Sequence, residues 1–387
     1  MSDATMTARR TVALSAAGIS LIAVCYGLAR FAYGLFVPAF RSTFELDGAT
    51  IGAIAAMSYV AYGAGILYAT VATPRLGARF VSVSAGGLGA IGCALIAAAP
   101  TPGILALGVA VAGSSTGVAS PPLAQVVARR VREQRRDRVQ TIINAGTGLG
   151  VLVSGPVALL AGDQWRLAWA AFAVLCAATA VWVGAVVPSA ADAGKREPRA
   201  RPRVPAGATP MVSAAVVVGL GTGAVWTFGQ DLLQGTGGQS AQAAAVVWIV
   251  LGACGLGGAL AGGVIGRAGI VLTWRMLVVA ASAATAVLAF APSSFLIAAF
   301  GSGVFGAVYI AVTGVLLVWS TRIFVESPAT GVGAAFLALA LGQALGSPLI
   351  GWVADLADLR VAIAVAAGLG LGALVFTPPR PAPRRSE

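Results

Sequence analysis

One arginine stands in an otherwise apolar stretch of the chain. Arg30 lies inside the segment Val12–Phe40, about four residues, or ~6 Å at 1.5 Å per residue, from a centre near Tyr26. A guanidinium at that depth in a bilayer costs at least ~2.5 kcal/mol, so water, an anion or carbonyl groups have to surround it. Either Arg30 binds an anionic or strongly dipolar solute through its planar fork, or it snorkels or pairs helices. Because intramembrane charge is functional by default, we favour solute binding.

The acidic residues offer few partners for this charge. Almost all of the 13 Asp and Glu residues fall between the apolar segments. Asp231 is the exception, near the end of the segment Met211–Leu233 and beside Gln230 and Gln234. It is either a gate partner or proton site, or an exposed residue at a loop edge. Asp163 and Asp355 are interpreted as residues that only terminate helices.

Residues for metal, haem or covalent catalysis are scarce. The chain has no histidine, and its four cysteines, Cys25, Cys93, Cys176 and Cys254, are far apart in apolar segments without a CxxC pair. Zinc, haem and Cys/His catalysis therefore lack ligands, and we expect no metal and no cofactor. A membrane-embedded lipid-modifying enzyme would need a catalytic cluster that the sequence does not offer.

The composition is that of an integral membrane protein. Of the 387 residues, 58% are hydrophobic and only 10% are charged, whereas soluble domains carry about 25% charged residues. The apolar residues form blocks of the ~20 residues that a membrane-spanning helix needs. Twelve such segments are predicted: Val12–Phe40, Ala49–Thr73, Phe80–Ala99, Gly103–Ala128, Val139–Ala161, Leu167–Val187, Met211–Leu233, Ala241–Ile265, Leu272–Phe290, Ser293–Trp319, Thr330–Val353 and Val361–Phe376.

The basic residues predict how the helices are oriented. If the N-terminus is cytoplasmic, 21 of the 25 Lys and Arg residues fall on the cytoplasmic side, and only Arg41, Arg166 and Arg360 fall outside. This distribution explains the net charge of +12 without a basic face for nucleic acid, so we expect no nucleic-acid partner. Both termini should then be cytoplasmic in a multi-pass protein of the cytoplasmic membrane.

A basic, proline-rich stretch divides the chain into two halves. Residues 189–210 are predicted to be a cytoplasmic linker between a six-helix bundle at 1–188 and another at 211–387. Positions match across the halves at an offset of 192: Gly27 with Gly219, Arg75 with Arg267, Gly150 with Gly342, Pro156 with Pro348. Such parallel repeats predict a pseudo-two-fold axis along the membrane normal and a site at midplane.

These features together resemble the major facilitator superfamily over the whole chain. The family's motif between helices two and three has a counterpart in Arg75, Gly77 and Arg79, and the second half keeps Arg267 and Gly269. Pro74 stands where the family has an acid. The run Arg30-Phe31-Ala32-Tyr33 resembles the first helix of a poorly characterised bacterial branch of the same superfamily.

The resemblance implies roles for further residues. Helices one and seven would face each other across a central cavity, so Asp231 would pair with Arg30 when the outer side closes. The motif residues would take part in gating or coupling. Aromatic residues of the cavity-lining helices are Tyr26, Tyr33, Tyr59, Tyr62, Trp226, Phe228 and Tyr309; helix-packing positions are Gly150, Gly155, Pro156, Gly342 and Pro348. Gln343 would either bind solute or bridge helices.

The expected function is secondary transport by alternating access. The solute is predicted to be an organic anion or polar metabolite held by Arg30, with the lipid bilayer as surroundings, protons as a possible coupling ion, and a monomer as the acting unit. A proton-coupled multidrug efflux antiporter is the alternative. The scarcity of buried acids argues mildly against it, because such exchange needs a carboxylate.

Topology is the first testable prediction. In a Cys-free variant, single cysteines placed in the termini or in residues 189–210 should resist an impermeant thiol reagent added to intact cells. The reason is the skewed distribution of Lys and Arg. Strong external labelling of the linker would overturn the orientation.

Overall fold

The described chain consists of helices that match the predicted spans, except that residues 259–265 of the predicted segment Ala241–Ile265 lie outside the described residues. The computed structural model describes residues 6–189, 205, 207–258, 267–325 and 327–379. Within these residues, ten helices are long and apolar enough to cross a membrane, and two shorter apolar helices cover Ala241–Gly257 and Leu359–Val375. Together they confirm the prediction of an all-α membrane protein with about twelve spans.

The first half contains six spans, two of them interrupted. Its elements are α1 (Ala8–Ile22), η1 (Ala23–Phe31) and α2 (Ala32–Phe44), which form one span; α3 (Gly48–Leu76); α4 (Ala78–Ala97); α5 (Pro102–Arg130); α6 (Glu133–Asn144) and α7 (Gly146–Ala161), which form another; and α8 (Trp165–Val186). The predicted loop between Ala128 and Val139 is much shorter, because α6 already begins at Glu133.

The second half repeats this order. Its elements are α9 (Ala208–Asp231) with η3 (Leu232–Thr236), α10 (Ala241–Gly257), α12 (Ile270–Phe290), α13 (Phe295–Ile323), α14 (Pro328–Leu356), and α15 (Leu359–Leu371) with η5 (Gly372–Val375). The predicted linker lies mostly outside the described residues, so the domain boundaries at 188 and 211 remain a prediction.

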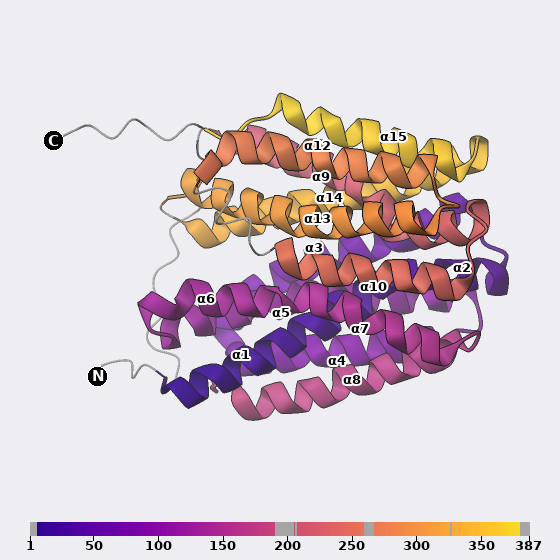
Figure 1. Cartoon of the computed structure of the whole chain (residues 1–387). Helices are drawn as coiled ribbons and strands as arrows, with labels where there is room; N and C mark the ends of the chain where they lie inside the picture. Colours follow the sequence, from indigo (N-terminus) through magenta and orange to yellow (C-terminus); the bar gives the residue numbers. More distant parts are fainter. Residues whose placement is uncertain (1–5, 190–204, 206, 259–266, 326, 380–387) are drawn as a thin grey trace.

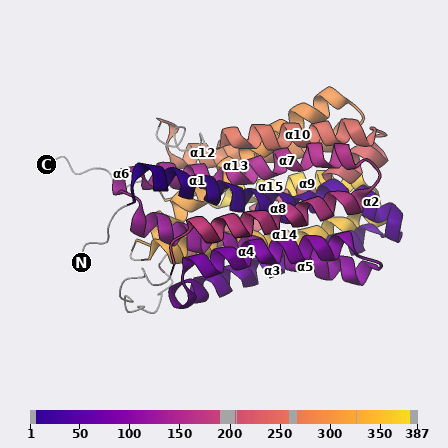
Figure 2. The same cartoon turned by 90° about the horizontal axis from the view of Figure 1, so that it is seen from below.

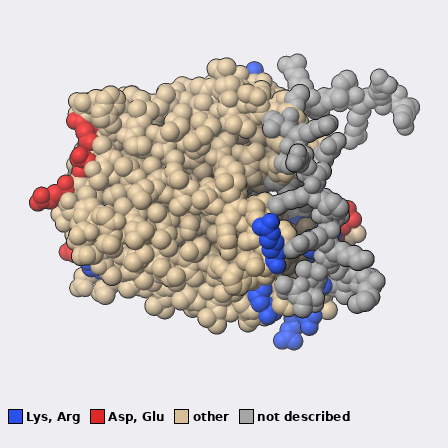
Figure 3. Space-filling view, turned by 180° about the vertical axis from the view of Figure 1, so that it is seen from behind, with Lys and Arg blue, Asp and Glu red and all other residues tan. Residues whose placement is uncertain are grey.

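The helices run side by side between two ends of opposite character. Figure 1 shows the first half below the second, with both chain ends on the left, and Figure 2 shows the same bundle from below. We call the end near the chain ends the termini end and the opposite one the distal end. In Figure 3 acidic side chains gather at the distal end and basic ones at the termini end, with almost no charge between. An uncharged band of this kind suits hydrocarbon.

The first span differs from the expected plain α-helix. Its middle, Ala23–Phe31, is a π-helix that contains both Gly27 and Arg30. Wide turns of this kind are rare and occur frequently at functional sites. No feature of the sequence pointed to this π-helix.

Paired glycines let helices cross closely at equivalent places in both halves. A Cβ atom on Gly27 would overlap the backbone of Gly150, and one on Gly219 would lie 2.9 Å from Gly342 Cα. The helix-connecting Gly77 (φ 87°, ψ 152°) and Gly269 (φ 77°, ψ 156°) also share a conformation that favours glycine. The same local geometry thus recurs at the offset of 192, as expected for pseudo-symmetric bundles.

The halves meet along two equivalent pairs of helices. α3 packs against α14, where Gly52 abuts the backbone of Ser347 and Pro348, and α7 packs against α10, where Gly155 abuts Ile249. The pair Ser347-Pro348 follows the pair Gly155-Pro156 at the repeat offset of 192 residues. Small residues at these positions bring the backbones together, as is common between membrane helices.

Replacing Gly150 tests the importance of this close packing. Gly150→Ala should destabilise the protein by roughly 1–3 kcal/mol, because its new Cβ would lie 2.8 Å from Gly27 Cα and clash with the backbone of Ala23. The measurement is the apparent melting temperature and monodisperse elution in detergent. Gly87→Ala is the matched control, since a Cβ there meets nothing within 4 Å. Equal stability of the two variants would contradict the prediction.

Candidate functional site

Arg30 lies buried between the two halves. Its side chain is 6% exposed, and its Nη2 donates a 2.8 Å hydrogen bond to Oε1 of Gln343 on α14. Nε2 of Gln343 in turn donates to the hydroxyl of Tyr309 on α13 at 3.2 Å. A single polar chain therefore crosses from the first half to the second.

Aromatic rings surround the guanidinium. Its Cζ lies 4.3 Å from the ring centroid of Tyr62 and 4.9 Å from those of Tyr59 and Phe31. Ring faces at these distances attract a cation, most strongly where water is excluded. Phe31 also stacks across the halves on Trp226, with centroids 4.0 Å apart and an interplanar angle of 29°. The ring centroids of Trp226 and Tyr309 lie 5.2 Å apart, so Tyr309 belongs to the same aromatic cluster.

Two donors in this cluster are not used. Arg30 Nε and Trp226 Nε1 are buried and have no hydrogen-bond partner among the described residues. Buried polar groups are nearly always paired, so each orphaned donor calls for an explanation such as a ligand. Chemically, both donors would pair with acceptor oxygens.

The remaining predicted cavity tyrosines have other partners. The Tyr26 hydroxyl shares a 2.8 Å hydrogen bond with Ser120 Oγ on α5, and its ring meets Tyr62 edge-on at 6.3 Å. The Tyr33 hydroxyl donates to the Ile51 carbonyl at 2.9 Å. Tyr26 thus borders the Arg30 cluster, whereas the hydroxyl of Tyr33 is committed to backbone within the first half.

Asp231 pairs with a different arginine from the one expected. Asp231 is 7% exposed, so the interpretation that it is an exposed residue at a loop edge is wrong. Its Oδ2 lies 2.8 Å from Nη2 of Arg41. Arg41 is eleven residues beyond Arg30, ~16 Å further along the span at 1.5 Å per residue, and so reaches the distal end. The expected Arg30–Asp231 pair is absent from this structure because Arg41 takes the carboxylate.

A second acid joins the halves at the distal end. Oδ1 of Asp355 accepts from Gly48 N and Oδ2 accepts from Ala49 N, both at 2.7 Å. A carboxylate at a helix N-terminus satisfies free amides and favours the helix dipole. Asp355 thus caps α3 from the opposite half, so the interpretation that it only terminates its own helix was incomplete.

The predicted motif residues lie at the termini end. Gly77 connects α3 to α4, and Arg79 Nε donates to the Val187 carbonyl at the end of α8 at 2.6 Å. Arg75 and Arg267 are exposed, and Gly269 directly precedes α12. The motif therefore braces helix ends in the first half and does not contact the Arg30 cluster in the bonds described.

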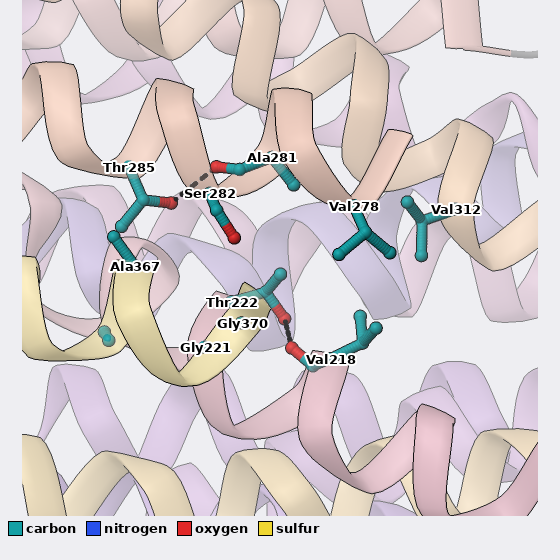
Figure 4. A pocket seen from close by; sticks show the side chains of 11 residues that line it. Val218, Gly221, Thr222, Val278, Ala281, Ser282, Thr285, Val312, Ala367 and Gly370 are labelled. Atoms are coloured by element: carbon teal, nitrogen blue, oxygen red, sulfur yellow. Dashed lines mark hydrogen bonds between the residues drawn. The ribbon is translucent and has the colours of Figure 1, made fainter. Parts of the chain in front are cut away.

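A small pocket lies within the second half, apart from Arg30. Figure 4 shows it between α9, α12, α13 and α15, and its volume of about 20 Å³ suits roughly one water molecule. The hydroxyls of Thr222 and Thr285 bond to carbonyls of their own helices. It is too small for a transported solute. Nor do the described residues contain a group of three or more His, Cys, Asp or Glu that could hold a metal.

The Arg41–Asp231 pair should hold the distal end closed. Asp231→Asn should shift the balance toward distal opening by about fivefold, since a pair of this exposure contributes about 1 kcal/mol. Spin labels at Ser42 and Ser293, both exposed at this end, would report longer distances in a Cys-free background. The control is Asp163→Asn, an exposed acid of the same end. An unchanged distance distribution would show that the pair does not secure closure.

Comparison with known structures identifies the fold. A mutant of the nucleoside transporter NupG is 16% identical, with a TM-score of 0.76, covering 94% of this chain and 98% of that one. A bacterial homologue of the human lysosomal transporter Spinster, in an inward-facing, unoccupied conformation, is 16% identical with a TM-score of 0.69, covering 96% and 95%. At such identities the likeness establishes the fold alone.

Sequence comparison establishes the family. A search of curated protein sequences found no significant match. The family profile described as "Uncharacterised MFS-type transporter YbfB", however, matches residues 22–377. The all-helical fold agrees with that match, with ten candidate spans and two shorter apolar helices among the described residues, and the chain belongs to this family of major facilitator transporters.

Proposed function

We propose that this transporter moves a small organic anion across the cytoplasmic membrane by alternating access, with Arg30 as the group that binds it. The observation that carries the proposal is the burial of Arg30 between the halves with a neutral partner, Gln343. An unneutralised guanidinium in the hydrocarbon zone attracts negative charge strongly. An anion that bridges the halves would neutralise it during transport.

The distal contacts supply a gate for such a cycle. Arg41 with Asp231, and Asp355 with the first amides of α3, both join the halves at the distal end. Both have to separate before a solute enters from that side. By the distribution of Lys and Arg, the distal end would face outward and the termini end the cytoplasm.

Proton-coupled multidrug efflux receives less support from the site. Exchange of protons for cationic drugs calls for a carboxylate near the bound solute. Asp231, the buried acid of the described spans, is engaged with Arg41, and the Arg30 cluster itself contains a cation. A cationic drug would be repelled there.

Substitution of Arg30 tests the proposed function. Uptake of a panel of labelled organic anions, sugars and cationic drugs into proteoliposomes would first find a solute. Arg30→Ala should abolish its transport, and Arg30→Lys should lower it by at least about tenfold, because lysine keeps the charge but lacks the planar fork.

Folding has to be separated from function in this test. Monodisperse elution would show that the variants remain folded, and Arg360→Ala, at an exposed distal arginine, is the matched control. Normal anion transport by Arg30→Ala, or selection of a cationic drug by the wild type, would refute the proposal.

A further inference from the structure

The guanidinium of Arg30 has one edge that is only half occupied. Nε and Nη2 point the same way and form a two-donor fork. Nη2 donates to Gln343 Oε1 at 2.8 Å, whereas Nε, in a side chain 6% exposed, has no partner among the described residues. An amide has one acceptor oxygen, so Gln343 satisfies one donor and leaves the other.

The same chain shows what a carboxylate does at such a fork. At Arg41, Nη2 lies 2.8 Å from Asp231 Oδ2, and Nε lies 3.1 Å from Oδ2 and 3.3 Å from Oδ1. Both donors of that edge are satisfied by one carboxylate. The contrast between the two arginines indicates that the fork of Arg30 fits a carboxylate better than the amide it holds.

The groups around the fork favour a substrate with an aromatic ring and one negative charge. The rings of Phe31, Tyr59 and Tyr62 have centroids within 4.9 Å of the guanidinium carbon, and Trp226 stacks on Phe31. The faces of Phe31, Tyr59 and Tyr62 are turned to the guanidinium, so a substrate ring would meet these residues edge-on, an arrangement that aromatic pairs favour. The orphaned Trp226 Nε1 adds a second buried donor for an acceptor oxygen.

We propose that the transported anion is a monocarboxylate on a flat aromatic ring, whose carboxylate displaces Gln343 and takes both Nε and Nη2 of Arg30. The proposal rests on the function proposed above and narrows its substrate class. Gln343 then has the role of a specificity-determining residue: it occupies Arg30 when no substrate is bound. Because Gln343 belongs to the second half, its displacement also breaks a bond between the halves when substrate binds.

Ligand chemistry provides the first test. Benzoate, benzamide, cyclohexanecarboxylate and benzenesulfonate would be titrated by calorimetry and thermal shift into the purified full chain. Benzoate should bind, and the other three at least about tenfold more weakly, because each lacks the charge, the flat ring or the planar two-oxygen group. Absence of benzoate binding, or equal affinity for any of the other three, would overturn the proposal.

Two substitutions of Gln343 separate displacement from simple bridging. In Gln343→Glu the new carboxylate should fill the Arg30 fork as Asp231 fills that of Arg41, so benzoate affinity should fall at least about tenfold. In Gln343→Leu the competing oxygen is gone, and affinity should be kept or increased. If Gln343 only bridges helices, the order of the two benzoate affinities reverses: Gln343→Glu binds benzoate more tightly than Gln343→Leu, because Glu keeps a bond to Arg30 and Leu does not.

The outcomes also separate this inference from the proposed function. If Arg30→Ala binds and transports anions normally, the proposed function fails. If Arg30 is required but benzamide or cyclohexanecarboxylate binds as well as benzoate, only the aromatic carboxylate class fails. Should Gln343→Leu not fold, Gln343→Met and the ligand series on the wild type still decide the question.

Discussion

A guanidinium buried between two helical bundles has to be satisfied by the groups around it, and much of the site follows from that requirement. Arg30 is 6% exposed, and one amide oxygen and three ring faces surround its guanidinium, while Nε has no partner among the described residues. Since the amide comes from the other half, the same contact that solvates the charge also ties the halves together. Charge burial and bundle docking are therefore coupled at one residue.

The distal end solves a similar problem with full charges. Arg41 and Asp231 neutralise each other across the halves, and Asp355 is stabilised by two amides at the start of α3. The Arg41 side chain is 35% exposed, so breaking this pair costs less than separating two fully buried charges. Contacts that can be broken at modest cost are compatible with the proposed opening of this end.

Glycine packing makes these polar contacts possible. Gly27 against Gly150 and Gly52 against the backbone of Ser347 bring helices closer than side chains would permit. At Gly27 the helix also widens into a π-helix, which includes Arg30. Within each half, close crossings recur at equivalent positions, Gly27 with Gly150 and Gly219 with Gly342.

The sequence by itself determined the helices, their approximate ends and the internal repeat, and it singled out Arg30 as a candidate, because hydrophobic blocks, glycines and a charge in an apolar segment act locally. Only the tertiary structure decided the partners: Gln343 instead of Asp231 for Arg30, Arg41 for Asp231, and Asp355 as the cap of α3. Partners more than 180 residues apart depend on helix rotation and on the π-helix at Ala23–Phe31, which redirects the side chains that follow. A pattern of residue types indicates how side chains are spaced along one helix, but it does not indicate the angle at which two helices cross.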